Sequence, residues 1–376
     1  MKSKIGYDAT AITKVHDGGK DQVSINLLRG FENKGLSEEL VVFCIPEMEE
    51  YIRALIPKAL VVPVAAKKMW KKTIQDIWTR TLLLQTLIQQ HHIGVLLFPM
   101  SNTGLRRFAI PTVVIPHDIQ TQTHKGRFPL RTRALAAFFY HFDFRLRDWI
   151  IAISGFDQKE LEETYPAYTS KIVQIYNPIR ADIFMAAEGY KADRPYITAI
   201  NIQHRHKNII TLIKAFERLK DQIPHDLYLI GRIKPETAFL SAYVKEHELS
   251  DRVKFLGFVE DERLAGVLKG SALYVNPSLF EGFGMTAVEA MLSEVPTLTT
   301  LLSAVPEVTM GLCHYYEPAE DPEALAAAMS TVLVGDKGNS ADELKLIAEK
   351  LKSRYDYAII AKQYYDFLQS IQTEGK

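Results

Sequence analysis

Short runs of apolar and β-branched residues alternate with amphipathic stretches along the whole chain of 376 residues. Such runs are typical of strands that lie buried between two layers of helices. Strands of this kind form parallel sheets, because each amphipathic stretch then serves as the helical connection to the next strand. The pattern predicts an α/β fold with strands at 4–9, 39–45, 94–99, 112–116 and 149–154 and, in the second half, at 196–201, 226–231, 252–257, 273–278 and 296–300.

The same plan occurs in both halves, which predicts two domains. A chain of this length is too long for one ordinary hydrophobic core. The hinge is expected in the segment 174–184, where Asn177 and Pro178 interrupt the pattern. We therefore predict two doubly wound domains, with helices at 23–33, 73–90, 207–220, 236–247, 261–269 and 285–293. Ligands of such sheets bind beyond the carboxyl ends of the strands, so the loops there are expected to face a cleft between the domains.

The composition is typical of a soluble globular enzyme, with 47% hydrophobic and 24% charged residues. No stretch approaches the ~18 to 20 apolar residues of a transmembrane helix, and the N-terminal segment has no signal-peptide core. Cys44 and Cys313 lie far apart among apolar neighbours, so buried free thiols are expected. These features predict a cytoplasmic protein.

The charge is balanced overall but not along the chain. Residues 1–180 hold 24 Lys and Arg against 17 Asp and Glu, and the remainder holds 21 against 28. A positive first half indicates that this half meets an anionic partner. Nucleic acid is a poor candidate, because no recognition motif is present and the chain lacks a strong basic excess.

Missing motifs argue against two kinds of chemistry. The Gly18-Gly19 turn after the first expected strand is not a G-x-G-x-x-G, and no other segment has that fingerprint, so hydride transfer loses its main support. The turn is either a ligand-binding loop or a flexible connection. No Asp-x-Asp and no His/Cys cluster with metal spacing occurs, so we predict no catalytic metal.

Two carboxylates flank a glycine turn in the segment 279–291, LFEGFGMTAVEAM. Thr286 and Glu289 have the S/T-x-x-E spacing of a capping box, which would satisfy N–H groups at a helix start. That interpretation leaves Glu281 and the glycines unexplained. The second interpretation is a ligand held at the helix start, where free N–H groups and the helix dipole favour negative charge.

Two further loops follow expected strands at their carboxyl ends. His117 and Asp118 follow one of them; a lone histidine is usually structural, but a neighbouring carboxylate can fix the tautomer of a functional one. Arg205 and Lys207 follow another and precede a helix. Two cations at a helix start can hold a diphosphate, although a solvated basic loop is the common alternative.

Two stretches of the first half combine cations with aromatic residues. Such mixtures are typical of a protein that rests on an anionic bilayer, and equally of an ordinary solvated face over a packed helix. The residues are Lys67, Lys68, Trp70, Lys71, Lys72, Trp78 and Arg80 in the first stretch, and Arg131, Arg133, Phe138, Phe139, Tyr140, Phe142, Phe144, Arg145, Arg147 and Trp149 in the second.

Taken together, these residues resemble the retaining glycosyltransferases of family four, which have the GT-B fold. EGFG at 281–284 followed by EAM at 289–291 is similar to the E-x7-E motif of that family. Other segments match it in order and spacing, namely 152–161, 176–179, 255–284, 303–308 and 317–329. The family's Arg-Lys-Asn reads Arg205-His206-Lys207-Asn208 here, with one residue inserted, and Thr286 stands near the place of a family proline.

The resemblance implies roles for individual residues. Glu289 would hold the ribose hydroxyls of a nucleotide-sugar, and Glu281 would accept hydrogen bonds from its sugar. Lys207, with Arg205, would neutralise the diphosphate. The remaining expected contacts are the backbone amides of Phe283, Gly284 and Met285 to sugar and phosphate, Thr286 beside them, Gly257 and Phe258 at the base, Gly18 and Gly19 over the phosphates, and His117 at the reaction centre.

The resemblance also implies the overall organisation and activity. An acceptor-binding Rossmann-like domain would span 1–176, with a C-terminal helix at 356–373 packing back on it, and a nucleotide-sugar-binding domain would span 177–355. The expected activity is retaining, metal-independent hexosyl transfer from a donor such as a UDP- or GDP-sugar to a saccharide or lipid-linked acceptor, in cell-surface polysaccharide or glycolipid synthesis. The alternatives are a nucleotide-sugar-binding protein without transfer activity and a sugar-nucleotide epimerase. An anionic membrane surface on the inner face of the membrane is an expected further partner of the first domain.

Overall fold

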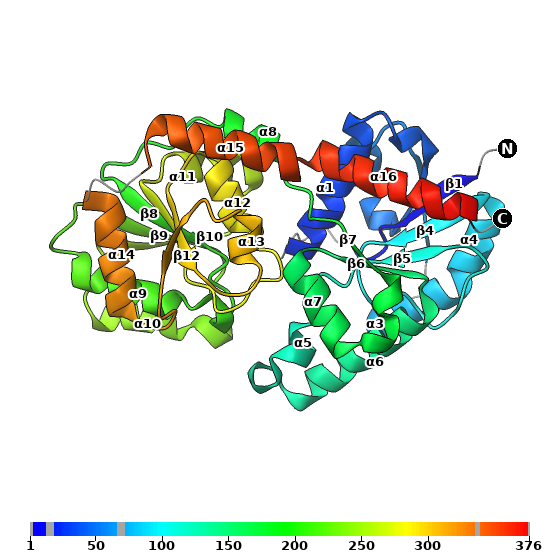
Figure 1. Cartoon of the computed structure of the whole chain (residues 1–376), viewed down its shortest axis with the longest axis horizontal. Helices are drawn as coiled ribbons and strands as arrows, with labels where there is room; N and C mark the ends of the chain where they lie inside the picture. Colours follow the sequence, from blue (N-terminus) through cyan, green and yellow to red (C-terminus); the bar gives the residue numbers. More distant parts are fainter. Residues whose placement is uncertain (1–2, 13–18, 66–71, 335–338, 375–376) are drawn as a thin grey trace. The chain divides into compact units, whose positions relative to one another are not determined.

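The computed structural model describes residues 3–12, 19–65, 72–334 and 339–374. The chain forms two compact units, Met1–Pro178 with Tyr357–Lys376, and Ile179–Asp356 (Figure 1). The chain thus leaves the first unit after Pro178 and returns to it at Tyr357.

The first unit contains a sheet of seven strands in the order β3-β2-β1-β4-β5-β6-β7, and every neighbouring pair is parallel. The central strands are buried along their length, as their apolar sequences predict. The strands are β1 (Lys4–Asp8), β2 (Leu40–Cys44), β3 (Leu60–Pro63), β4 (Ile93–Phe98), β5 (Thr112–Val114), β6 (Trp149–Ala152) and β7 (Ile172–Gln174).

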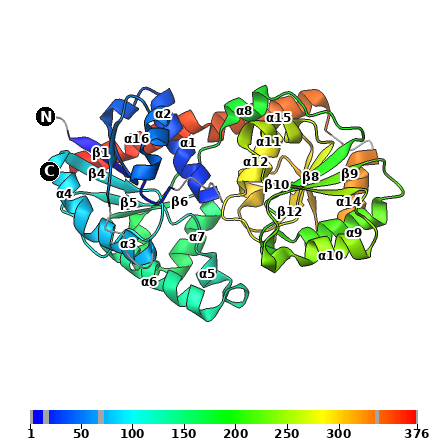
Figure 2. The same cartoon turned by 180° about the vertical axis from the view of Figure 1, so that it is seen from behind.

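Helices cover both faces of this sheet, as the views from the two sides show (Figures 1 and 2). They are α1 (Gly19–Asn33), α2 (Glu49–Leu55), α3 (Lys72–Trp78), α4 (Leu84–Gln90), α5 (Gln120–Thr123), α6 (Leu130–Leu146), α7 (Gly155–Thr164) and the C-terminal α16 (Tyr357–Glu374). Helices α1 and α16 approach each other closely at Gly30, where an added Cβ would lie 2.2 Å from the Tyr357 carbonyl oxygen. The absence of a side chain there lets the last helix pack against the first.

The second unit contains a six-stranded parallel sheet in the order β10-β9-β8-β11-β12-β13. Its strands are β8 (Tyr196–Ile200), β9 (Asp226–Ile230), β10 (Val253–Gly257), β11 (Leu273–Asn276), β12 (Thr297–Thr300) and β13 (His314–Tyr316). Its helices are α8 (Ala181–Ala186), α9 (Ile209–Leu219), α10 (Phe239–Glu246), α11 (Asp261–Lys269), α12 (Met285–Leu292), α13 (Val305–Val308), α14 (Pro322–Val334) and α15 (Ala341–Tyr355).

Helix α9 illustrates how these elements assemble. Ile209, Leu212, Ile213 and Phe216 recur at helical spacing and are buried in one apolar cluster with residues of the sheet. Burying such side chains contributes about 1.5–3 kcal/mol each, which places the helix on the sheet. The helix begins directly after the basic loop 203–208, so its packing also positions that loop.

The predicted α/β fold with two doubly wound parallel sheets is confirmed. All ten predicted strands are present, whereas the edge strands β3, β7 and β13 were not predicted. These three strands have only four, three and three residues, which is too short for a clear strand pattern in the sequence. The single helix predicted at 73–90 is divided by a π-helical turn, Thr79–Leu83.

Candidate functional site

The strongest constellation lies at the carboxyl end of the second unit's sheet. Lys207 ends a short 3-10 turn after β8, and Glu281 follows β11. The Leu279 amide donates to the His206 carbonyl at 2.8 Å, which joins the two loops. Lys207 Nζ then lies 2.7 Å from Glu281 Oε1, and the two side chains are only 12% and 11% exposed. Residues 74 positions apart thus form a charged pair at the site predicted for a diphosphate and a sugar.

The Glu281 carboxyl group is ionised at neutral pH. Burial acts to raise the pKa of Glu281, but the adjacent Lys207 ammonium offsets it, and the net pKa is lowered. An ammonium has three N–H donors, and the bond to Glu281 uses one of them. The pair can therefore hold the carboxylate in place and still present positive charge to a ligand.

The loop after Glu281 leads into α12 through Gly284, which has a φ of 92°. A Cβ there would come no closer than 3.4 Å to Val305, so the left-handed backbone rather than lack of space requires glycine. Because the capping residue has no side chain, no side-chain cap occupies the N–H groups at the positive end of the helix dipole.

The capping-box interpretation of Thr286 and Glu289 is wrong. Helix α12 begins at Met285, so Thr286 is inside the helix, and no side chain caps it from Gly284. The Thr286 hydroxyl instead accepts a hydrogen bond of 2.8 Å from the Tyr274 hydroxyl on β11. The interpretation failed because the helix starts at Met285, directly after the glycine turn, two residues before the start that a cap at Thr286 requires.

Glu289 lies one turn into α12 with only 8% of its surface exposed. In the described part of the chain its carboxylate has no hydrogen bond or ion pair. Burial, and secondarily the charge of Asp261, raises the pKa of Glu289 to about 8. A buried carboxyl group without a partner costs stability, so this side chain is suited to a ligand that supplies hydrogen-bond donors.

The ends of β9 and β10 form the neighbouring loop. The Gly231 amide donates to the Gly257 carbonyl at 2.8 Å, and Gly257 has a φ of 69° with open space where a side chain would be. Phe258 is 51% exposed, and the Arg232 guanidinium lies 5.2 Å from the centre of its ring. Asp261, which acts on the pKa of Glu289, starts the following helix α11. The loop at Gly257 and Phe258 therefore lies near Glu289.

Arg205 does not join Lys207 at Glu281. Its Nε donates to the Glu236 carbonyl at 3.2 Å, and its guanidinium lies 5.5 Å from the centre of the Phe239 ring. In a 3-10 turn, residues two positions apart differ in direction by about 240°. The two cations therefore point to different neighbours.

Phe283 and Met285 flank the turn at Gly284. The Phe283 side chain is buried and packs edge-on against Tyr355 of α15, with 5.4 Å between ring centres. Met285 is the first residue of α12. The roles predicted for these two residues concern their backbone amides, and the packing of Phe283 fixes the backbone at this point.

In the first unit, His117 follows β5 with a φ of 70° and is buried. Its Nε2 lies 2.7 Å from the Pro99 carbonyl, which can only accept, so Nε2 carries the proton. Burial, together with the Lys20 charge, lowers the pKa of His117 to about 3. The ring is therefore neutral at physiological pH.

The expected role of Asp118 in fixing the tautomer of His117 is wrong, because Pro99 does so. Asp118 Oδ1 instead accepts from the Gln120 amide at 3.3 Å. Gly19 is the first residue of α1, and Gly18 lies outside the described residues.

Several residues were assigned to a surface that the structure places inside the fold. Arg80 is buried, and its Nε lies 2.8 Å from Asp8 Oδ2 in a pair that is 4% and 1% exposed. The π-helical turn contains Arg80 and has no sequence signature, although Asp8 at the end of a strand could have been singled out. Arg147 is also fully buried, and its guanidinium contacts the ring of Phe98.

Of the first basic stretch, Lys67, Lys68, Trp70 and Lys71 lie outside the described residues. Within the described part of the chain, none of the helices has the length and hydropathy that crossing a membrane requires. The same residues contain no group of three or more His, Cys, Asp and Glu arranged to hold a metal ion. Cys44 is a buried free thiol, and Cys313 is free and half-buried.

Two family models match adjoining parts of the chain. The one described as "Glycosyl transferases group 1" matches residues 181–351, and the one described as "Glycosyltransferase Family 4" matches residues 18–183. Their boundary falls where the two compact units divide.

Curated relatives and a solved structure agree with this assignment. The chain is 27% identical over 212 residues to the phosphatidylinositol N-acetylglucosaminyltransferase gpi3 subunit of Schizosaccharomyces pombe, covering 54% of this chain and 46% of that protein. It is 26% identical over 183 residues to the O-antigen chain mannosyltransferase RfbU of Salmonella typhimurium, covering 49% and 50%. These matches thus span about half the length of the relatives.

The fold is similar to that of the Anabaena protein HepE, whose structure contains UDP and glucose. The TM-score is 0.73 at 17% identity, with 98% of this chain and 100% of that one covered. At this identity the similarity concerns the fold alone. Together with the two family matches, it shows that the chain belongs to the group 1 glycosyltransferases of family four, which have the GT-B fold.

Proposed function

We propose that this protein transfers a sugar from a nucleotide-diphosphate sugar to a saccharide or lipid-linked acceptor. The observation that carries the proposal is the arrangement in the second unit. A largely buried lysine–carboxylate pair, a glycine-capped helix start and a buried carboxyl group without a partner among the described residues follow neighbouring strands there. Family membership supports the same class of reaction.

Each of these groups suits one part of a nucleotide-sugar. Lys207 and the N-terminus of α12 offer positive charge to the diphosphate. Glu281, held by Lys207, can accept hydrogen bonds from hydroxyls of the donor sugar. Glu289 can accept from the two ribose hydroxyls, which would supply the partners that it lacks in the protein.

The exposed ring of Phe258 and the Arg232 guanidinium over it suit the base, since both present flat surfaces on which a nucleobase can stack. HepE was solved with UDP, and a uridine or guanosine donor is what we propose here. Arg205 adds to the positive electrostatic potential near the diphosphate site, but its side chain contacts Glu236 and Phe239.

The proposed reaction is a metal-independent hexosyl transfer with retention of configuration. Cleavage of the sugar–phosphate bond develops positive charge on the sugar and negative charge on the leaving diphosphate. Lys207 and the α12 dipole would stabilise the leaving group without a metal. Because Glu281 is already paired with Lys207, we assign no nucleophile to the protein; the acceptor attacks from the face of departure and its proton passes to the leaving phosphate.

For His117 we propose a contact to a substrate hydroxyl. Nε2 is occupied by the Pro99 carbonyl, and the low pKa keeps the ring neutral. Nδ1 is then a hydrogen-bond acceptor and not an acid. Gly18 and Gly19 are proposed to lie over the donor phosphates.

The acceptor and cellular role rest on the relatives. The names of two of them refer to an O-antigen chain and to phosphatidylinositol. We propose a role in cell-surface polysaccharide or glycolipid synthesis, on the cytoplasmic side of a membrane.

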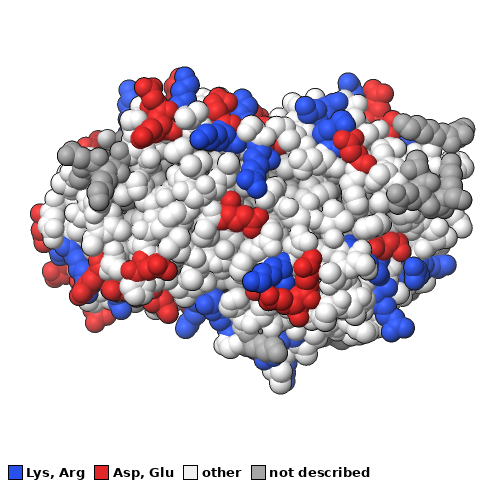
Figure 3. Space-filling view, viewed as in Figure 1, with Lys and Arg blue, Asp and Glu red and all other residues white. Residues whose placement is uncertain are grey.

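Membrane contact would involve α6. Leu130, Leu135 and Phe138 on this helix are 74%, 52% and 42% exposed, and Arg131 and Arg145 are exposed at its two ends. Tyr140 and Phe144 of the same helix are instead core residues. On the face of the molecule in Figure 3, acidic and basic side chains are interspersed, so the positive charge of the first half is not gathered in one patch there.

Vesicle co-sedimentation tests this contact. Phosphatidylglycerol vesicles should pellet the protein and phosphatidylcholine vesicles should not, and added salt should weaken the binding. Phe138→Glu with Leu135→Glu should abolish pelleting, whereas Leu346→Glu, at a leucine of α15 that is 57% exposed, should not. Equal pelleting of both variants would overturn the role of α6.

The central test is turnover with a panel of UDP-, GDP- and ADP-sugars, with sugar transfer, donor hydrolysis and epimerisation measured in parallel. Transfer to a saccharide or lipid-linked acceptor is the expected outcome. Tight nucleotide binding without any turnover would favour a binding protein, and interconversion of the free nucleotide-sugar would favour an epimerase.

A further inference from the structure

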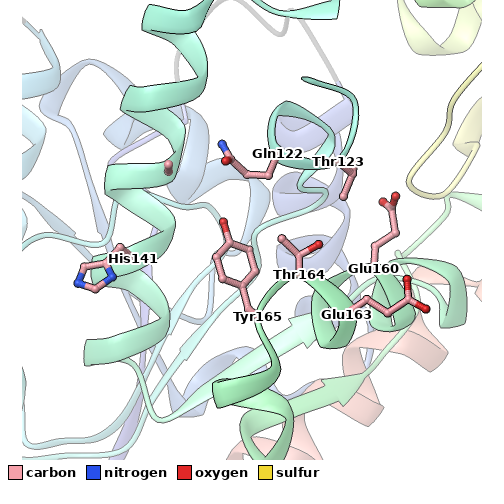
Figure 4. Close-up of a pocket in the computed structure, with 8 residues that line it drawn as sticks. Gln122, Thr123, His141, Glu160, Glu163, Thr164 and Tyr165 are labelled. Atoms are coloured by element: carbon pink, nitrogen blue, oxygen red, sulfur yellow. The ribbon is translucent and has the colours of Figure 1, made fainter. Parts of the chain in front are cut away.

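A second site lies in the first unit, in a groove between helices α5, α6 and α7 (Figure 4). The α5–α7 groove has a volume of about 620 Å³ and is lined by Gln122, Thr123, Ala137, His141, Glu160, Glu163, Thr164 and Tyr165. That volume falls within the ~300–1,000 Å³ typical of small-molecule sites. None of the roles assigned above uses these residues.

The groove is joined to the loop that carries His117. Helix α5 begins three residues after His117, at Gln120. The Tyr140 hydroxyl of α6 donates to the Asp118 carbonyl at 2.9 Å, and Gln122 Nε2 donates to the Arg133 carbonyl of α6 at 3.0 Å. These bonds fix the walls of the groove relative to the carboxyl end of β5.

Glu160 offers one carboxylate oxygen as a hydrogen-bond acceptor. Its Oε2 is buried and has no hydrogen-bond partner among the described residues. Burial of the group raises the pKa of Glu160 to about 7, with the charges of Asp118 and Glu163 contributing and a hydrogen bond from Thr123 opposing. Figure 4 shows the Glu160 carboxylate beside Thr123, with Glu163 further along the same side of the groove. Buried polar atoms without partners are rare, and each indicates a group that something else satisfies.

Tyr165 adds a surface of another kind. Its ring packs edge-on against Phe144, with 4.9 Å between centres, which holds it in place. Its hydroxyl points towards Gln122 (Figure 4). The tyrosine thus combines a fixed apolar ring with a hydroxyl that can donate or accept.

The charges of the groove select the class of ligand. The lining residues include no Lys or Arg, and two of them are carboxylates. A phosphate or other anion would be repelled, whereas a neutral ligand with several hydroxyl groups would find carboxylate, hydroxyl, amide and imidazole partners. The mixture of these acceptors and donors with the Tyr165 ring matches the alternating polar and apolar faces of a sugar.

We propose that the α5–α7 groove binds a neutral saccharide unit, through hydrogen bonds from sugar hydroxyls to Glu160 and contact with Tyr165. This inference rests on the proposed glycosyl transfer: the bound saccharide unit is part of the acceptor and lies away from the acceptor's reacting hydroxyl. The groove then selects acceptors that carry a second sugar residue.

Saturation-transfer NMR on the full chain tests the site without requiring catalysis. The probes are methyl α-mannoside, methyl α-glucoside and N-acetylglucosamine, with inorganic phosphate and spermidine as anionic and cationic comparisons. UDP is added in excess so that nucleotide occupies the second unit. We expect at least one sugar to give a titratable signal, with a dissociation constant that rises at least fivefold in Glu160→Gln and in Tyr165→Phe.

Two further variants control the result. Glu162 is on the same helix as Glu160 but does not line the groove, and its carboxylate accepts a hydrogen bond from Gln158 at 2.8 Å. The Glu162→Gln variant should therefore bind the sugars as the wild type does. Ala137→Phe adds a ring to the wall of the groove and should abolish the signal. Unchanged thermal midpoints and UDP affinity confirm that each variant is folded.

Sugars that bind the wild type and all variants alike, or no sugar binding at all, would overturn the proposal, as would binding of spermidine or phosphate in their place. In transfer assays, Glu160→Gln should raise KM for a disaccharide acceptor with kcat within twofold. If the Glu160→Gln variant transfers sugar with an unchanged KM, the proposed sugar site in the α5–α7 groove is contradicted, whereas the proposed glycosyl transfer is not. If no sugar transfer occurs but the sugars still bind the groove in the NMR experiment, the proposed glycosyl transfer is contradicted and the sugar site is not.

Discussion

A single buried carboxyl group links the fold of the second unit to its proposed ligand. Glu289 has a pKa near 8 because burial disfavours its charged form and no partner compensates. Two hydroxyl donors from a ribose would favour the charged form and lower the pKa in the complex. Nucleotide binding should therefore release a proton when the pH is below 8.

The first prediction follows from this linkage. Affinity for the nucleoside diphosphate should rise between about pH 6 and pH 8 and level off above, because only the ionised carboxylate accepts from both hydroxyls. Glu289→Gln cannot ionise, and its affinity should lack this component. Calorimetry from pH 6 to 9 on both proteins measures this pH dependence of the affinity. If the affinity of the variant changes with pH as that of the wild type does, another group, such as the phosphate, accounts for the pH dependence.

Lys207 and Arg205 allow a matched comparison of two cations on one turn. The Lys207 ammonium pairs with Glu281, whereas Arg205 contacts Glu236 and Phe239. Charge-assisted hydrogen bonds are worth about 1.5–3 kcal/mol. Lys207→Ala should therefore weaken nucleotide binding at least tenfold, and Arg205→Ala should weaken it less.

Calorimetric titration with the diphosphate nucleotide distinguishes the two variants. Lys207→Ala also leaves Glu281 buried without its cation, so the double variant with Glu281→Gln is the control for indirect effects. Unchanged affinity in Lys207→Ala would refute the assignment of the diphosphate site. A larger loss in Arg205→Ala would mean that the arginine moves to the ligand when it binds.

At the scale of elements, turns rather than helices decide where the functional side chains point. The 3-10 turn Arg205–Lys207 separates two cations, and the glycine turn before α12 places Thr286 inside the helix. The π-helical turn Thr79–Leu83 contains Arg80, which pairs with Asp8. Each of these turns departs from regular α-helical geometry, and the direction of the side chains changes with it.

The contact between α1 and α16 gives a prediction about stability. A Cβ at Gly30 would come within 2.2 Å of a backbone oxygen of α16, and backbone cannot move aside as a flexible side chain can. Gly30→Ala should therefore lower the free energy of unfolding by about 1–3 kcal/mol, as over-packing commonly does.

Urea unfolding measures the effect of this substitution. Gly126→Ala is the control, since its added Cβ meets nothing within 4 Å and its φ needs no glycine. Equal stabilities of the two variants would show that α16 shifts at little cost.

At the scale of the whole molecule, the proposed reaction requires that a leaving diphosphate be stabilised. The proposal assigns this task to Lys207 and the α12 dipole. Turnover in excess EDTA should then equal turnover in magnesium to within a factor of about two. Activity that EDTA abolishes and a divalent ion restores would assign the task to a metal.

The sequence alone was enough to predict the two parallel sheets, the loops at the carboxyl ends of their strands and the residue types in those loops. Apolar runs and helical spacing are local features, and burial between helix layers is their usual consequence. The family resemblance added roles for Glu281 and Glu289, which the motif carries at fixed spacing, and for Lys207, whose segment has one residue inserted relative to the family.

Only the tertiary structure decided which side chains meet. The pairing of Lys207 with Glu281, the partner of His117 at Pro99 and the burial of Arg80 join residues distant in sequence. The isolation of Glu289 likewise depends on what packs around it. A hydrogen bond requires correct distance and direction together, and direction is set by turns whose geometry depends on the packing of the whole unit.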